Sequence, residues 1–294
     1  MKQFILVLAL DVVMAFPVFA EDAAVLPAGT LRVDVDASTG FAGKAWDSDG
    51  AKTDAPNATI IGAALGAAYG FTGWFTAVFD WSPGVTDTDL TAIDIGNDGD
   101  GAAEIYEGLS DFSLKARFQI IGVNAPLQSE RFRLRLAPGV IIPFPGIDDK
   151  DASGNRAWGA GGEISFDTPV NGNFFVNARS DFYWFPFDNQ SKTNKDWELT
   201  LEAGPHYRFG IGGASLSLSL PVNWKAASEN GGGVSSHLLT LRPAAALKLT
   251  RPFTINIEIE YTLPIYGKNS YAVHTVTIKA PMYFNFAKNK NVEE

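Results

Sequence analysis

Like-charged side chains stand two residues apart at several places in this 294-residue chain. Lys115 and Arg117 form one such pair, and Arg133 and Arg135 form another. Alternate residues of a β-strand point to the same face, so this spacing gives each strand one basic face. Carboxylates recur at the same spacing in later segments. Charges arranged in this way can orient and select solutes inside a narrow pore, or they can fill a closed interior with salt bridges.

Both interpretations use the same ionisable residues, which we take as the candidate lumen and solute-selectivity residues. These are Lys115, Arg117, Arg133, Arg135, Glu163, Arg179, Asp181, Glu202, Arg242, Glu258, Glu260 and Lys279.

The three histidines offer no recognisable catalytic group. None of His206, His237 and His274 has a nucleophile and an orienting carboxylate that the sequence identifies. Ser236 is adjacent to His237, which sends the two side chains to opposite faces of a strand. We therefore predict no catalytic residues and no enzyme.

The segment 83–104 is rich in acidic residues and contains no basic one. Residues 97–101 partly match a calcium-binding loop, but Gly96 occupies the first ligand position. We expect neither a metal site nor a cofactor here. A solvated acidic loop would attract cations to the surface above it.

Composition narrows the class of protein. The chain has 23 Lys and Arg against 33 Asp and Glu, a net charge of −10, and this balance argues against nucleic-acid binding. Hydrophobic residues make up 46% and charged residues 19%, which excludes a disordered chain. The chain has no cysteine, so it is not a disulfide-stapled small domain.

The first twenty residues resemble a secretory signal. A basic Lys2 precedes an apolar run, and Val18, Phe19 and Ala20 suit a cleavage site. We predict cleavage after Ala20 and a single domain over residues 21–294.

Beyond residue 29 the hydrophobic period is two, in twelve segments of roughly ten residues, the length of a tilted membrane-spanning strand. Connections alternate between short ones and longer polar ones. The short ones are 70–73, 122–130, 168–173, 210–213 and 250–252, and the long ones include 40–57, 83–104, 143–157 and 225–235. This pattern predicts an all-β fold, a transmembrane antiparallel up-and-down barrel of 12 strands with short periplasmic turns and long extracellular loops.

Tryptophans and prolines add two further expectations. Trp81, Trp158, Trp184, Trp197 and Trp224 fall near the long loops on the apolar face, as in an aromatic girdle at the lipid headgroups. Pro138, Pro205, Pro243 and Pro281 interrupt the segments, where we expect bulges or bends because proline cannot donate to a ladder. A soluble β-sandwich is the alternative, although it would not sort its loops by length.

Over residues 21–294 this architecture resembles the bacterial outer-membrane β-barrel channels. Residues 108–118, GLSDFSLKARF, resemble a strand motif of the phenol-degradation-pathway (MetA-like) outer-membrane proteins. The larger fatty-acid transporters of that membrane begin with a plug. Here only residues 21–28 precede the first strand, so no comparable plug is expected.

The resemblance implies an outer-membrane channel for passive diffusion of small polar or charged solutes, in a double-membrane bacterium. The expected partners are outer-membrane lipid and small solutes, with the chain as a monomer. A closed structural barrel that binds a surface partner through its loops is the alternative. A hydrolase at the rim, with His274 as its base, is the third interpretation, and an apolar-ligand transporter would require a wall that opens sideways.

Overall fold

In the computed structural model, the described residues are 25–81, 84–88, 106–108, 111–144, 157–171, 173–187, 195–211, 214–229, 236–249 and 255–286. The expected export signal (1–20) and the calcium-like segment (97–101) lie outside these ranges. None of the described residues belongs to a helix long and apolar enough to cross a membrane.

One sheet contains all the described strands, and every pairing is antiparallel except a short one between β6 and β7. The strands are β1 (Thr30–Trp46), β2 (Lys52–Thr72), β3 (Phe75–Trp81), β4 (Gly84–Thr88), β5 (Tyr106–Gly108), β6 (Phe112–Gly122), β7 (Leu127–Gln128), β8 (Arg133–Ile142), β9 (Gly159–Asn171), β10 (Phe174–Trp184), β11 (Lys195–Ile211), β12 (Ala214–Ser219), β13 (Val222–Glu229), β14 (Ser236–Leu241), β15 (Ala244–Leu249), β16 (Ile255–Lys268), β17 (Ser270–Tyr271), β18 (His274–Lys279) and β19 (Met282–Asn285).

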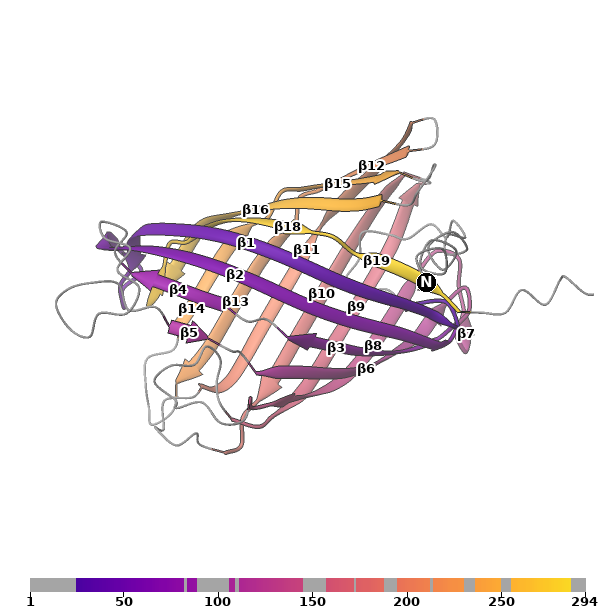
Figure 1. The fold of residues 1–294 in the computed structure, drawn as a ribbon, viewed down its shortest axis with the longest axis horizontal. Coiled ribbons are helices and arrows are strands. Elements are labelled where there is room, and N and C mark those ends of the chain that lie inside the picture. The colour runs from indigo at the N-terminus through magenta and orange to yellow at the C-terminus, as the bar shows by residue number, and fades with distance from the viewer. Residues whose placement is uncertain are drawn as a thin grey trace, which may run out of the picture.

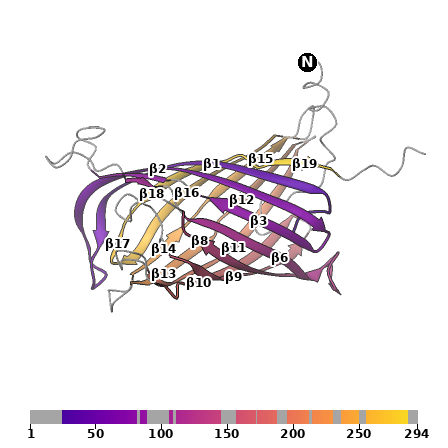
Figure 2. The ribbon, with the colours of Figure 1, turned by 60° about the horizontal axis from the view of Figure 1, so that its bottom comes forward.

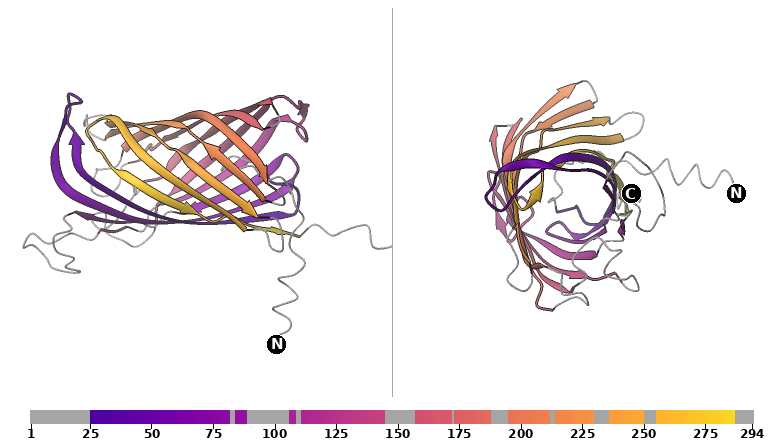
Figure 3. Two further views of the ribbon diagram at one scale, coloured as in Figure 1. Left: turned by 90° about the horizontal axis from the view of Figure 1, so that it is seen from above. Right: turned by 90° about the vertical axis from the view of Figure 1, so that its left-hand side faces the viewer.

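These pieces form twelve barrel strands (Figure 1). Five of the twelve are interrupted and consist of β3 with β4, β5 with β6, β12 with β13, β14 with β15, and β17 with β18 and β19. The barrel closes where β1 pairs with β2 on one side and with β17, β18 and β19 on the other. Figure 2 shows the strands crossing the barrel obliquely, and the end view in Figure 3 shows them surrounding an interior. The predicted closed antiparallel barrel of 12 strands is confirmed.

Along each strand, apolar side chains point out of the barrel and polar side chains point into its interior, which is the reverse of a soluble protein. Ile164 on β9 and Phe182 on β10 point outward and are 55% and 47% exposed. Their polar neighbours Glu163, Asp167 and Asp181 point inward and are buried. Exposed apolar side chains around a closed sheet are stable when lipid covers them, so the pattern is that of a membrane barrel.

The first long connection differs from the expectation. Residues 40–57, predicted as a loop, are mostly strand, because β1 continues to Trp46 and β2 begins at Lys52. The turn between them is closed by Asp47, whose carboxylate accepts hydrogen bonds from the backbone N–H groups of Asp49 and Ala51 at 2.8 and 2.9 Å. Such a side-chain-closed turn leaves few residues for a loop, so the hairpin extends as paired strand beyond the rest of the rim.

Prolines interrupt the ladders, as predicted. Pro243 and Pro281 separate β14 from β15 and β18 from β19. Opposite Pro205 in β11, pairing passes from β13 to β12. The ladder between β8 and β6 skips Ala137 and Pro138. The ladder between β8 and β9 continues there and pairs Pro138 with Gly162. Each break lies where a proline removes a backbone donor.

Beyond Pro281 the pairing of the last strand changes. The ladder between β16 and β18 ends at Glu258 and Lys279. After the break at Pro281, β19 pairs with β1. In the register of the ladder between β16 and β18, the residues opposite β19 are 252–255, of which 252–254 lie outside the described residues.

Candidate functional site

A basic cluster occupies the inner face of β6, β9 and β10. The carboxylate of Glu163 lies 3.4 Å from Arg117 and within 3.8 Å of both Lys115 and Arg179. Arg179 Nε also donates to Asp181 at 2.7 Å. One buried carboxylate is thus surrounded by three cations, which neutralises charge that would otherwise be costly inside the wall.

A second group lies beside this cluster on β8 and β9. Arg135 pairs with Asp167, and its Nε donates to Ser165 at 3.2 Å. Arg133 lies 3.5 Å from Asp167. Arg135 and Asp167 are almost completely buried, so this group contributes to the wall rather than to an accessible surface.

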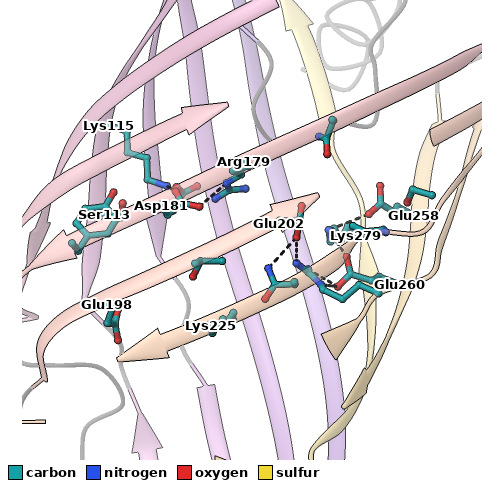
Figure 4. A pocket seen from close by; sticks show the side chains of 18 of the residues that line it. Ser113, Lys115, Arg179, Asp181, Glu198, Glu202, Lys225, Glu258, Glu260 and Lys279 are labelled. Carbon is teal, nitrogen blue, oxygen red and sulfur yellow. Dashed lines mark hydrogen bonds and ion pairs between the residues drawn. The ribbon is translucent and has the colours of Figure 1, made fainter. Parts of the chain in front are cut away.

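A third group continues along the wall from β11 to the C-terminal strands. Arg242, in the break between β14 and β15, lies 2.6 Å from Glu202 and 2.5 Å from Glu260. Lys279 lies 3.0 Å from Glu258 and 3.2 Å from Glu260. Glu202 stands opposite Arg179 in the ladder between β10 and β11, so this group begins beside the Arg179–Asp181 pair (Figure 4).

Residues of the first and third groups line a central cavity of about 420 Å³. Eight of the twelve candidate residues line it, namely Lys115, Arg179, Asp181, Glu202, Arg242, Glu258, Glu260 and Lys279. Arg117 lines a second cavity instead. Arg133, Arg135 and Glu163 line neither of these cavities, because their side chains are held within the wall by ion pairs.

The second cavity, of about 200 Å³, lies along β1, β2 and β3. Its lining includes Asp34, Ala64 and Gly66, so small residues of β2 leave room beside the charged ones. Asp80, Lys115 and Arg179 line both cavities. We call these three residues the neck.

Asp80 was absent from the candidate residues, although it has the same inward position as Thr76 and Val78 on β3. The alternation of β3 was sufficient to find it. Asn223 was also missed. It is almost fully buried and donates from its amide to Glu202 at 3.2 Å. Its position follows a proline break, where counting by two along the sequence is less secure.

The residues that precede β1 enter the barrel interior at the end where β1 begins. Leu26 is 3% exposed and packs against Ala68 and Val78 on the inner faces of β2 and β3. Its backbone N–H donates to the hydroxyl of Thr76 at 2.8 Å. The sequence predicted no plug comparable to that of the fatty-acid transporters. The structure has a smaller one, in which a single leucine inserts at the end of the interior.

The five tryptophans that the sequence predicts to form an aromatic girdle have the outward alternation of their strands and lie at different positions along them. Trp158 and Trp184 are about half exposed, and Trp184 pairs with Trp197 across β10 and β11. Trp81 stacks on Phe144 with ring centroids 6.1 Å apart. Trp224 pairs with Leu201, four positions along β11 from Trp197, because β13 continues to Glu229.

Near the rim, His274 has partners that do not form a catalytic group. Its Nδ1 lies 2.7 Å from the hydroxyl of Tyr261, and its ring stacks on Phe41. Within the described part of the chain, no group of three or more acidic or histidine side chains could hold a metal ion.

Comparison with solved structures agrees with the barrel. The structure resembles the COG4313 outer membrane channel from Pseudomonas putida F1 with a TM-score of 0.69 and 16% identity, covering 91% of this chain and 100% of that one. Weaker likenesses include the NanC porin (TM-score 0.45, 8% identity, 85% and 98% coverage) and a mutant of the TodX monoaromatic hydrocarbon channel (0.44, 10%, 89% and 91%). No protein-family model and no curated protein sequence matches the chain. The fold is therefore that of outer-membrane β-barrel channels.

Proposed function

We propose that this chain is an outer-membrane channel that lets small polar or charged solutes diffuse through a charge-lined lumen. The observation that supports the proposal most is the central cavity. It lies inside a closed barrel, has a volume of about 420 Å³ and is bordered by ionisable side chains of both signs. Such a lining favours hydrated solutes over apolar ones, because each charge keeps partners in the wall while facing water.

Its direct test is single-channel conductance of the refolded barrel in a planar bilayer. Thr200 lines the central cavity, whereas its neighbour Leu199 has the opposite, lipid-facing position on β11. We expect steady current steps from the wild type, smaller steps from Thr200→Trp and unchanged steps from Leu199→Trp. The two variants add the same side chain one residue apart, so only a pore through the cavity separates them.

Silence from a barrel shown to be folded by its heat-modifiable migration on a gel would overturn the channel proposal. A closed structural barrel acting through its loops would then be favoured, with binding lost on deletion of residues 89–104, a deletion that leaves β4 in place. Lipid or peptide turnover abolished by His274→Ala would instead favour a rim hydrolase.

A further inference from the structure

The neck contains two groups of opposite charge, Lys115 and Asp80, that form no hydrogen bond with the described residues. The side chain of Lys115 is 9% exposed, yet its nearest carboxylates, those of Asp181 and Glu163, lie 3.7 and 3.8 Å from its ammonium nitrogen. These separations are beyond hydrogen-bond length. Within the described residues, Lys115 therefore has ion pairs but no hydrogen bond for its three N–H donors.

Asp80 provides the opposite charge. It lines both cavities, and among the described residues its carboxylate has neither a hydrogen bond nor an ion pair. Asp80 and Lys115 lie on the paired strands β3 and β6. They are diagonal neighbours offset by two residues, since Asp80 pairs with Ser113 and Val78 pairs with Lys115. They nevertheless form no ion pair with each other.

Arg179 on β10 adds a guanidinium to the neck, because it also lines both cavities. Its side chain and that of Lys115 both lie within 3.8 Å of the Glu163 carboxylate, so the two cations are close to each other. Buried polar groups without close partners are costly, and a bound solute with matching groups removes that cost.

From this arrangement we infer that the neck is a binding site for small zwitterionic solutes, that is, solutes with one carboxylate and one ammonium group. The carboxylate takes hydrogen bonds from Lys115 and Arg179, and the ammonium donates to the carboxylate of Asp80. This inference rests on the proposed channel function and specifies its solute class. A simple anion binds only Lys115 and Arg179, and a simple cation binds only Asp80.

Glycine and glycolamide make a matched pair of probes, because they have the same number of heavy atoms and only glycine is zwitterionic. Each is titrated into the single-channel potassium chloride current. A solute that binds at the neck obstructs ions, so we expect glycine to reduce the current at a concentration at which glycolamide has no effect beyond viscosity. In Lys115→Met and in Asp80→Asn, the half-blocking glycine concentration should rise about tenfold, the change expected on losing a hydrogen bond to a charged group.

Lys225→Met is the control, since Lys225 also lines the central cavity but is not part of the neck. Glycine block should be unchanged in this variant. Equal block by glycine and glycolamide, or equal loss of block in Lys225→Met, would overturn the zwitterion site while leaving the channel in place. Absence of any current from folded wild-type barrel would overturn both the channel and the site.

Discussion

Arg135 and Asp167 form an ion pair between β8 and β9, and neither residue is more than 2% exposed. Asp167 stands opposite Arg133 in the ladder, and Arg135 stands opposite Ser165, so the pair is diagonal. This pair lies inside the wall, away from both cavities described above. Its contribution should therefore be to stability rather than to solute selection.

Arg135→Met tests this separation. Removing one partner leaves the buried Asp167 carboxylate without its Arg135 ion pair, and breaking a buried ion pair costs about 3–5 kcal/mol. We expect the free energy of unfolding, measured by urea titration in lipid vesicles with tryptophan fluorescence, to fall by about 3 kcal/mol.

The matched control is the double variant Arg135→Met, Asp167→Asn, in which the buried carboxylate is replaced by a neutral amide and Arg133 loses an ion pair at a side chain that is 20% exposed. It should recover a large part of the lost stability, because the penalty comes from the orphaned carboxylate. Wild-type stability in the single variant would show that the pair contributes nothing. A changed ion preference in a stable single variant would show that Arg135 faces the ion path.

Sequence alternation predicted which side chains face inward, because the side-chain period of a strand is fixed at two. It could not predict which of them meet. Arg133 and Arg135 have equivalent positions in the sequence pattern to Lys115, yet only Lys115 reaches the cavities. That outcome depends on the offset between neighbouring strands and on diagonal reach, such as that of Arg135 toward Asp167, and neither is encoded in the spacing along one strand.

The residues before β1 show a second limit of the sequence. Leu26 belongs to no alternating segment, and nothing in residues 25–29 marks the chain as turning inward. It does so because Ala68 and Val78 leave an apolar patch on the inner wall, and Thr76 offers a hydroxyl to the Leu26 backbone. Such contacts join residues about fifty positions apart and follow only from the closed barrel.

Arg242 is the cation best placed to affect ion preference. It lies between Glu202 and Glu260 on the border of the central cavity, so Arg242→Met leaves two acidic groups facing that cavity. We expect the ratio of potassium to chloride permeability to rise by up to about fivefold, since one unit charge at 4 Å in water is worth about 1 kcal/mol. Reversal potentials in a potassium chloride gradient measure the ratio.

Arg131→Met is the control for that experiment. Arg131 is exposed in the connection before β8 and is not part of the central cavity's lining. Its loss should leave the reversal potential close to that of the wild type. An equal shift in both variants would mean that net charge, rather than position beside the cavity, sets the preference.

Gly66 keeps the second cavity open. A Cβ at this position would lie 3.2 Å from the Asp34 carboxylate and 3.3 Å from that of Asp80. Gly66→Leu therefore places a branched side chain between two acidic groups that line the passage, and we expect a marked fall in single-channel conductance. Gly210→Leu is the control, because no atom lies within 4 Å of a Cβ there. Equal conductance in the two variants would place the ion path outside the second cavity.

Gly70 tests whether the residues before β1 restrict the interior. A Cβ on Gly70 would lie 2.3 Å from the carbonyl oxygen of Pro27 and 2.7 Å from that of Leu26, so Gly70→Ala must displace this segment. Because Leu26 inserts beside Ala68 and Val78, its displacement opens that end of the interior. Single-channel conductance should increase in Gly70→Ala, and also in Leu26→Asp, where burial of a charge expels the segment without altering the wall.

Leu127→Ala, which shortens an exposed leucine of β7, should leave the conductance unchanged. If the conductance of Gly70→Ala and Leu26→Asp equals that of the wild type while all three variants migrate as folded barrels, the N-terminal segment does not limit the flow of ions. The narrowest part of the path would then lie elsewhere, and the neck at Asp80, Lys115 and Arg179 would be the first place to examine, because these residues line both cavities.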